Sequence, residues 1–234
     1  MRATVRMAAV LVAVLVSACA AVNTPSQRAE ALVDSARLTV LGFERSHDSQ
    51  MDLFRAQLKK AQGVLIFPSL LKAGLMVGVE GGNGVLVARG PDGTWGYPAF
   101  YTLGAGSIGW QIGGQSADTI MLLRSPGAVR AVVENQGKLG ADIGVTVGAV
   151  GAGAEAATTT NLGADVLVFS RAIGFYGGAS LEGAVIARRN DLNGAFYAPG
   201  TTPRQIVLDR SARNPRADDL RRALAAGTGG SIAK

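Results

Sequence analysis

Residues 104–109, Gly-Ala-Gly-Ser-Ile-Gly, have the G-x-G-x-x-G spacing that cradles a pyrophosphate in dinucleotide-binding folds. That chemistry requires a long helix starting at the third glycine and an acidic residue about 20 positions further on, which binds the ribose. The pair Gly113-Gly114 would interrupt such a helix, and the acid nearest to the expected position is Glu134. We therefore predict that these glycines belong to a β-sheet and that the chain binds no nucleotide.

Nucleophilic and metal chemistry have few candidate residues. Ser69 and Lys72 match S-x-x-K, the nucleophile motif of penicillin-recognising enzymes, but the companion motifs S-D-N and K-T-G do not follow. His47 is the only histidine and Cys19 the only cysteine, so neither a Ser-His-Asp triad nor a zinc site is readily assembled. We expect no cofactor and no metal.

Three aspartates could supply acid–base chemistry if folding brought them together. Asp118, Asp142 and Asp165 each follow an alanine just before an apolar run. They would form a general acid–base set only inside one shared pocket. Residues in such positions more often mark strand entrances or discourage edge pairing. We predict that the chain is not an enzyme.

The N-terminus has the pattern of an export signal. Arg2 and Arg6 precede an apolar run over residues 7–16, which is too short to span a bilayer. The small residues before Cys19 resemble the lipobox of bacterial lipoproteins, which implies removal of residues 1–18 and acylation of Cys19. The alternative is an ordinary signal peptide with an incidental cysteine.

The predicted anchor narrows the location and the partners. Two or three acyl chains hold a protein stably on a membrane. Ala20 stands where an aspartate would resemble an inner-membrane retention signal, so the resemblance implies the periplasmic face of the outer membrane. The formal net charge of +6 falls to +4 once Arg2 and Arg6 are removed, and this mild positive excess suits anionic lipid head groups. Nucleic acid is not an expected partner, because the cations form no stripe interleaved with aromatic residues.

The helices that would position these residues are indicated by periodicity and capping residues. Residues 19–27 are polar and indicate a tether, and residues 28–41 and 49–62 have helical apolar spacing. Ser125 and Pro126 begin a short inserted helix that Gly137 would end. Asn214-Pro215 opens a final helix.

Apolar runs between turn residues predict strands throughout the middle of the chain. The expected strands are Gly63–Pro68, Gly74–Glu80, Val85–Arg89, Trp95–Leu103, Ser107–Gln115, Thr119–Leu123, Leu139–Val150, Ala164–Ser170 and Gly174–Ala187. Residues 81–84, Gly-Gly-Asn-Gly, predict a hairpin turn. Gly140, Gly144 and Gly148 would share one face of a strand, which indicates close approach of another backbone layer or strong curvature.

The helix over residues 49–62 carries a basic margin. Arg55 and Lys59 are i, i+4 neighbours, Lys60 flanks them, and an apolar stripe of Met51, Phe54 and Leu58 lies beside them. A helix of this kind can lie on an anionic bilayer. Alternatively, the stripe faces the core and the cations complement the helix dipole. The sequence leaves both arrangements open.

Several segments, taken together, resemble the SYLF domain, a lipid-binding family that includes actin-binding proteins of yeast endocytosis. The Gly-x-Gly-Ser-x-Gly-Trp-Gln-Ile-Gly-x-Gln-Ser-x-Asp run is the most specific match. The matching segments are residues 61–78, 83–89, 98–123, 138–151 and 170–186. The resemblance implies a non-catalytic module that binds membranes, partly through a segment that corresponds here to residues 48–62.

The expected fold class is α+β: two N-terminal helices, then a curved, glycine-rich antiparallel sheet, sandwich or partial barrel with one short inserted helix, and a C-terminal helix. The SYLF-like domain is predicted over residues 28–210, and the C-terminal helix and tail over 211–234. Actin and phosphoinositides are not expected in a periplasm, so anionic phospholipid is the predicted ligand. The expected lipid-binding residues are Arg55, Lys59, Lys60 and Lys72, and Cys19 is the expected anchor. The alternative is a scaffolding protein that docks an envelope protein through its sheet.

Overall fold

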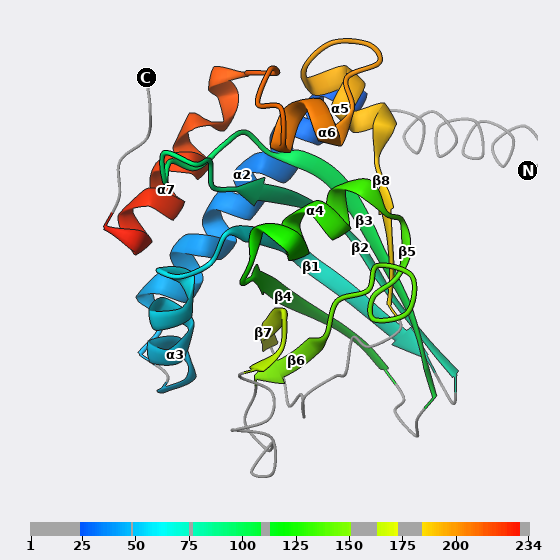
Figure 1. Cartoon of the computed structure of the whole chain (residues 1–234). Helices are drawn as coiled ribbons and strands as arrows, with labels where there is room; N and C mark the ends of the chain where they lie inside the picture. Colours follow the sequence, from blue (N-terminus) through cyan, green and yellow to red (C-terminus); the bar gives the residue numbers. More distant parts are fainter. Residues whose placement is uncertain are drawn as a thin grey trace, which may run out of the picture.

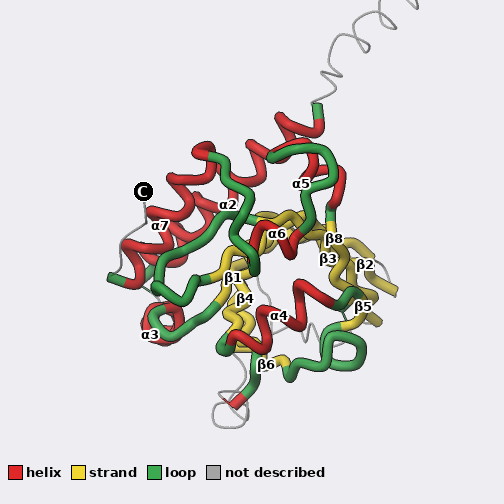
Figure 2. The backbone as a smooth tube through the Cα atoms, turned by 45° about the horizontal axis from the view of Figure 1, so that its top comes forward, coloured by secondary structure: helices red, strands yellow, loops and turns green. Residues whose placement is uncertain are grey.

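The computed structural model describes residues 24–47, 49–74, 77–108, 113–150, 163–172 and 184–229. Cys19 and the expected signal peptide, most of the expected tether (residues 19–23) and most of the expected strand Gly174–Ala187 lie outside them. One eight-stranded sheet organises the described part, in the order β5-β8-β3-β2-β1-β4-β7-β6. The sheet curls into a half-barrel around α4, with helices on both of its faces (Figures 1 and 2). The predicted α+β class is confirmed.

Two N-terminal helices precede the sheet, as expected. α2 (Pro25–Arg45) begins three residues before the predicted start, because Thr24 and Gln27 form a capping box and Pro25 occupies the first turn. α3 (Ser49–Leu58) follows after a short link. The apolar stripe of α2 is buried, from Ala29 to Phe43.

The described strands are β1 (Gly63–Gly74), β2 (Val77–Ala88), β3 (Ala99–Ile108), β4 (Gly113–Leu123), β5 (Gly137–Lys138), β6 (Val147–Val150), β7 (Val166–Ala172) and β8 (Val185–Arg188). Some of them join segments that were expected to be separate, as in β2, whereas β6 is shorter than the strand expected there. Adjacent strands pair antiparallel, except β6 and β7, which are parallel. The sheet is therefore mixed rather than purely antiparallel.

The predicted hairpin at residues 81–84 is wrong. β2 runs through this segment, which pairs with β3 along its length, while Gly81 also pairs with Leu71 of β1. A side chain at Gly84 would overlap the carbonyl oxygen of Ile66 and the ring of Phe67. These glycines therefore permit close approach inside a central strand, and they do not form a turn.

The glycine motif at residues 104–109 lies in a strand as far as it is described. β3 includes Gly104 and Gly106 and ends at Ile108, so the predicted sheet placement is confirmed. No described atom lies within 4 Å of a Cβ built at either glycine. The expected reason, close approach of another backbone layer, does not hold at these two positions. The motif's third glycine lies outside the described residues.

The middle of the expected strand Ser107–Gln115, residues 109–112, lies outside the described residues, and its two ends belong to β3 and β4. The expected strand Leu139–Val150 is wrong as a continuous element. Gly140 and Gly144 have φ values of 92° and 67°, so they form left-handed turns, and the strand starts only at Val147. The prediction was wrong because a sequence in which glycine alternates with valine has the pattern of a strand even where the glycines form turns.

Further helical segments follow or connect the described strands. α4 (Pro126–Glu134) has the predicted Ser125 cap, although it ends at Asn135 rather than at Gly137. α5 (Asn190–Phe196) and α6 (Pro203–Val207) were not predicted. The expected C-terminal helix divides into a 3-10 turn, η2 (Pro215–Ala217), and α7 (Asp218–Thr228).

Two apolar cores lie on opposite faces of the sheet. Val64 and Ile66 face the core formed with α2, α3, α5 and α7, whereas Leu65 and Phe67 face the core formed with α4 and α6. Successive residues of a strand point to opposite faces, so a strand covered on both sides becomes a continuous apolar run. None of the described helices combines the length and apolarity needed to span a bilayer.

Candidate functional site: a basic surface around Gln62

Gln62 connects the ends of three strands. Its backbone N–H donates to the carbonyl of Leu123 at 2.8 Å, and its carbonyl accepts from the N–H of Arg89 at 2.8 Å. These bonds extend the pairing of β1 with β4 and with β2 beyond the strand ends. The residues that follow or precede each strand there are consequently held close together.

Cations gather at this end of the sheet. Lys59 and Lys60 directly precede the link to β1, Arg89 follows β2, and Arg124 follows β4. Both lysines are exposed, as is Arg124. We call this set, with Arg130 and Arg210 described next, the Gln62 surface.

A cleft of about 110 Å³ opens within the Gln62 surface. Three arginines from different parts of the chain contribute to its walls: Arg89 after β2, Arg130 on α4 and Arg210 after α6. The remaining lining is mostly apolar. It comprises Gln62, Ala88, Gly90, Pro91, Pro126, Val129, Val207 and Leu208.

The guanidinium of Arg89 is positioned by an aromatic ring and a backbone carbonyl. It lies 4.6 Å from the ring centroid of Trp95 and donates to the carbonyl of Leu58 at 3.4 Å. Burial lowers the pKa of Arg89 from its usual value, because removal of water disfavours the charged form. Its Nε finds no hydrogen-bond partner among the described residues.

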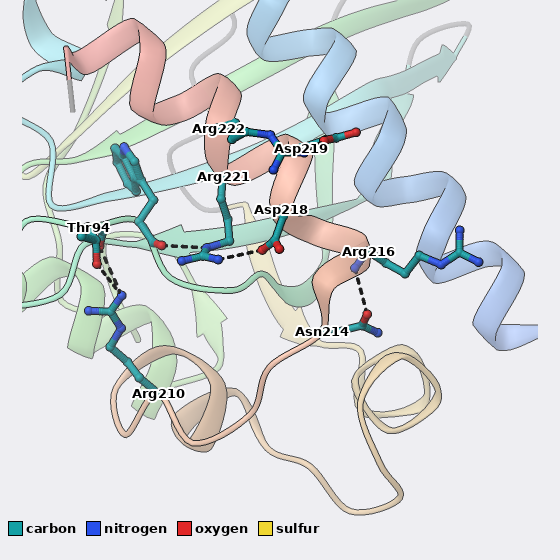
Figure 3. Close-up of polar contacts among 9 residues, drawn as sticks. Thr94, Arg210, Asn214, Arg216, Asp218, Asp219, Arg221 and Arg222 are labelled. Atoms are coloured by element: carbon teal, nitrogen blue, oxygen red, sulfur yellow. Dashed lines mark hydrogen bonds and ion pairs between the residues drawn. The ribbon is translucent and has the colours of Figure 1, made fainter. Parts of the chain in front are cut away.

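Arg210 crosses the turn at residues 90–93 and is held there. It donates to Asp92 Oδ1 at 3.0 Å. It also donates to Thr94 Oγ1 at 3.0 Å (Figure 3). Hydrogen bonds from Thr94 and Arg210 lower the pKa of Asp92 to about 2. The guanidinium passes so close to Gly90 that a Cβ there would overlap it.

Arg221 of α7 fixes the adjoining loop. Its Nε donates to the carbonyl of Trp95 at 2.9 Å, and its Nη1 pairs with Asp218 at 2.7 Å (Figure 3). The guanidinium also lies 4.2 Å from the ring centroid of Tyr97. Arg221 is buried, so these contacts position the loop and do not offer a charge to a ligand.

The apolar stripe of the helix predicted at residues 49–62 packs into the core. Met51, Phe54 and Leu58 are buried, and Phe54 packs against rings of α2 and β7. Of the two arrangements left open, the structure has the core-facing one. Arg55 Nη1 donates to the carbonyls of Glu44 at 2.8 Å and Ser46 at 3.0 Å.

The other expected contact residues lie in different places. Lys59 and Lys60 belong to the Gln62 surface. Lys72 lies towards the opposite end of β1, nine residues after Gly63, a separation of about 30 Å along a strand. Cys19 lies outside the described residues. The structure therefore groups two of the four predicted lipid-binding cations and separates Lys72 from them.

The three aspartates considered for acid–base chemistry are not brought together. Asp118 pairs with Arg171 of β7 at 3.5 Å, and Asp142 accepts from the N–H of Lys138. Asp165 accepts from Thr146, whose hydrogen bonds lower the pKa of this carboxyl. Each aspartate stabilises a local backbone arrangement. Within the described ranges, no three His, Cys, Asp or Glu residues lie close enough to hold a metal.

Ser69 likewise has a structural setting. It has a φ of 57° at an irregularity of β1, and its N–H donates to Asp118 Oδ1 at 3.3 Å. The serine therefore lies at a bulge within one strand. A nucleophile motif would require this serine to begin a helix, and it does not.

Comparison with known sequences identifies the family of the chain. Residues 104–227 match the sequence model described as "Ysc84: Las17-binding protein actin regulator". The chain belongs to this family, the Ysc84 or SYLF family, which confirms the resemblance noted in the sequence.

Relatives occur in yeast and in animals. The chain is 35% identical to Protein YSC84 of Saccharomyces cerevisiae over 170 residues, which are 71% of this chain and 36% of that protein. It is 34% identical over 170 residues to LAS seventeen-binding protein 3 of the same yeast, covering 71% and 37%. It is 32% identical over 164 residues to human SH3 domain-containing YSC84-like protein 1, covering 70% and 48%. The chain thus spans less than half the length of these relatives.

Proposed function

We propose that the chain is a non-catalytic module that binds anionic membrane surfaces through the Gln62 surface. The observation that carries this proposal is the clustering of six cations, Lys59, Lys60, Arg89, Arg124, Arg130 and Arg210, at one end of the sheet. Two carboxylates, Asp92 and Asp165, lie beside them. Each cation near an anionic bilayer contributes about 1 kcal/mol.

The mode of contact differs from insertion of an amphipathic helix. The apolar stripe of α3 is occupied by the core, so the exposed residues Lys59 and Lys60, which follow this helix, remain for the lipid. Binding would then be electrostatic, reversible and weakened by salt. We expect Lys72 and Arg55 to contribute less to lipid binding. Lys72 is remote from the Gln62 surface, and Arg55 already donates to two backbone carbonyls.

A lipid anchor at Cys19 is part of the proposal. It would follow removal of residues 1–18, leave residues 19–27 as a tether, and hold the protein on the periplasmic face of the outer membrane. α2 extends about 30 Å from Pro25 to Arg45, and α3 follows its far end (Figure 1). Lys59 and Lys60, which follow α3, would then lie away from the anchoring membrane. They would face a second membrane or a lipid molecule that is not part of a bilayer.

Vesicle flotation tests the proposal. The chain from residue 19 onward, carrying Cys19→Ser, contains every described element and lacks an acyl anchor. We expect it to float with vesicles containing phosphatidylglycerol or cardiolipin and not with neutral vesicles. The double variant Lys59→Glu/Lys60→Glu should bind more than about tenfold more weakly. The control Arg28→Glu/Arg216→Glu, with the same charge change at exposed sites, should bind normally; equal loss in both would contradict the proposed surface.

Docking of a protein partner is the second candidate function. It is supported by the description of the family and the names of its yeast relatives, which refer to binding of Las17. In this chain the partner would be an envelope protein that contacts the sheet. Crosslinking in cells followed by purification from membranes should then recover one specific partner in stoichiometric amount. Recovery of lipid without protein would favour the first candidate.

A further inference from the structure

The cleft in the Gln62 surface combines a cationic rim with an apolar floor. Three arginines, Arg89, Arg130 and Arg210, line it, and we call them the rim; we call the apolar lining residues, which include Val129 and Val207, the floor. A surface that only attracts a bilayer needs charge but no cavity. An apolar cavity rimmed by guanidinium groups fits an amphiphilic anion, whose charged group meets the rim and whose carbon chain meets the floor.

The rim arginines retain capacity for a ligand. Arg130 makes no hydrogen bond or ion pair with any described residue, and it is exposed at the mouth of the cleft. Arg89 makes a single long hydrogen bond to a carbonyl, in addition to its contact with Trp95. Only Arg210 already has a carboxylate partner, Asp92. No acidic residue lines the cleft itself, so the rim keeps an excess of positive charge.

The type of cation favours phosphate over carboxylate. A guanidinium presents paired N–H donors in a plane that match two oxygens of a phosphate. Three such groups around one cleft supply more donors than the two oxygens of a carboxylate can accept. The cavity of about 110 Å³ has room for one small headgroup and the first carbons of a chain.

Gly90 makes the position of Arg210 possible. The guanidinium of Arg210 passes directly over this glycine, and the φ of Gly90 is outside the left-handed region. Alanine is therefore compatible with the backbone there, but its Cβ would displace the arginine. This provides a way to move one rim group without deleting it.

We propose that this cleft is a binding site for the phosphate group of a phosphomonoester lipid, with phosphatidic acid as the simplest ligand of the class. The proposal rests on the proposed function, and it adds selectivity for a headgroup to general attraction by charge. Free phosphate shares the recognised chemistry but lacks the chain that would contact the floor.

Two soluble probes separate these sources. The Cys19→Ser chain is titrated with inorganic phosphate and with dihexanoylphosphatidic acid, while the methyl signals of Val129 and Val207 are followed by NMR. We expect both probes to shift these signals, with tighter binding of the short-chain lipid. Equal affinities would assign the site to free phosphate and overturn the lipid proposal. No shift at either valine with either probe would overturn the site altogether.

Variants then assign the rim. Arg130→Gln should weaken binding of dihexanoylphosphatidic acid about tenfold, because one charge-assisted interaction is lost, while Arg28→Gln on α2 should stay within about twofold. Gly90→Ala should weaken it by displacing Arg210. Unchanged affinity in Arg130→Gln and Gly90→Ala would overturn the assignment.

Vesicle flotation of the same variants separates the two proposals. Vesicle binding that depends on Lys59 and Lys60, without shifts in the cleft, would overturn this inference and leave the proposed function intact. Absence of vesicle binding by the parent chain would overturn the proposed function itself.

Discussion

Arg55 of α3 donates to the backbone carbonyl of Glu44, near the end of α2, at 2.8 Å. A second bond reaches the carbonyl of Ser46 at 3.0 Å. The last carbonyls of a helix lack partners within the helix, so this guanidinium satisfies two of them and fixes the corner between α2 and α3. A residue predicted to contact lipid thus has a structural role that can be measured separately.

We predict that Arg55→Gln lowers the free energy of unfolding by about 1–3 kcal/mol, because hydrogen bonds from a charged donor are lost at a half-buried site. Lys59→Gln and Lys60→Gln should change it by no more than about 0.5 kcal/mol. Urea denaturation followed by circular dichroism measures both. Equal stability of Arg55→Gln and the parent would contradict the structural role.

The glycines of the sheet should differ in their tolerance of a side chain. Gly84→Ala would overlap Ile66 and Phe67, and we expect a loss of about 1–3 kcal/mol. Gly104→Ala, on the neighbouring strand, meets no described atom within 4 Å and should be close to neutral. Thermal unfolding of the pair tests this difference. A large loss at both positions would restore the interpretation in which every sheet glycine permits close backbone packing.

Asp92 should make the stability of the fold depend on pH in the acidic range. Because hydrogen bonds hold its pKa at about 2 in the folded chain, against about 3.9 when unfolded, it stabilises the fold above pH 4. This contribution is lost as the pH falls from about 4 to about 2. We predict that Asp92→Asn lowers the melting temperature at pH 7 and has little effect near pH 2. A constant difference across this range would exclude the carboxylate's charge as the cause.

Glu44 should have the opposite effect. Burial raises its pKa, and its Oε1 has no hydrogen-bond partner among the described residues. The folded state therefore holds a proton more tightly than the unfolded state, so ionisation of Glu44 opposes folding above its ordinary pKa of 4.5. We predict that Glu44→Gln raises the melting temperature at pH 7, and that the gain shrinks as the pH falls through 4.5. A loss at pH 7 would show that Arg45 and Arg55 outweigh the burial.

Capping residues and hydrophobic spacing predicted the elements whose start is determined by residues close by in the sequence. Ser125 and Pro126 predicted the start of α4, and the change from helical to strand spacing at Gly63 predicted the start of the sheet. The glycines near Asn83 were predicted as a turn because they tolerate positive φ, whereas pairing on both sides makes them a strand interior. That pairing is set by residues about 10 to 20 positions away along the chain, beyond any local pattern.

The candidate site was predictable only in part. Lys59 and Lys60 could be proposed from the basic margin of one helix. No shared signal links Arg89, Arg130 and Arg210, because Arg130 lies on α4 and the other two follow separate elements. They meet only in the folded chain, where Gln62 joins the strand ends. Arg210 and its partner Asp92, for example, are 118 residues apart in the sequence.

Which surface of the protein touches the bilayer is the most direct question for the proposed function. Cys19→Ser removes the only cysteine, so a nitroxide can be attached through Pro91→Cys beside the cleft or through Ser35→Cys on the exposed side of α2. Power-saturation electron paramagnetic resonance with phosphatidylglycerol vesicles then reports contact of each label with lipid. We expect lipid contact at position 91 and solvent exposure at position 35. Contact at position 35 alone, or equal exposure of both labels in the bound protein, would contradict binding through the Gln62 surface.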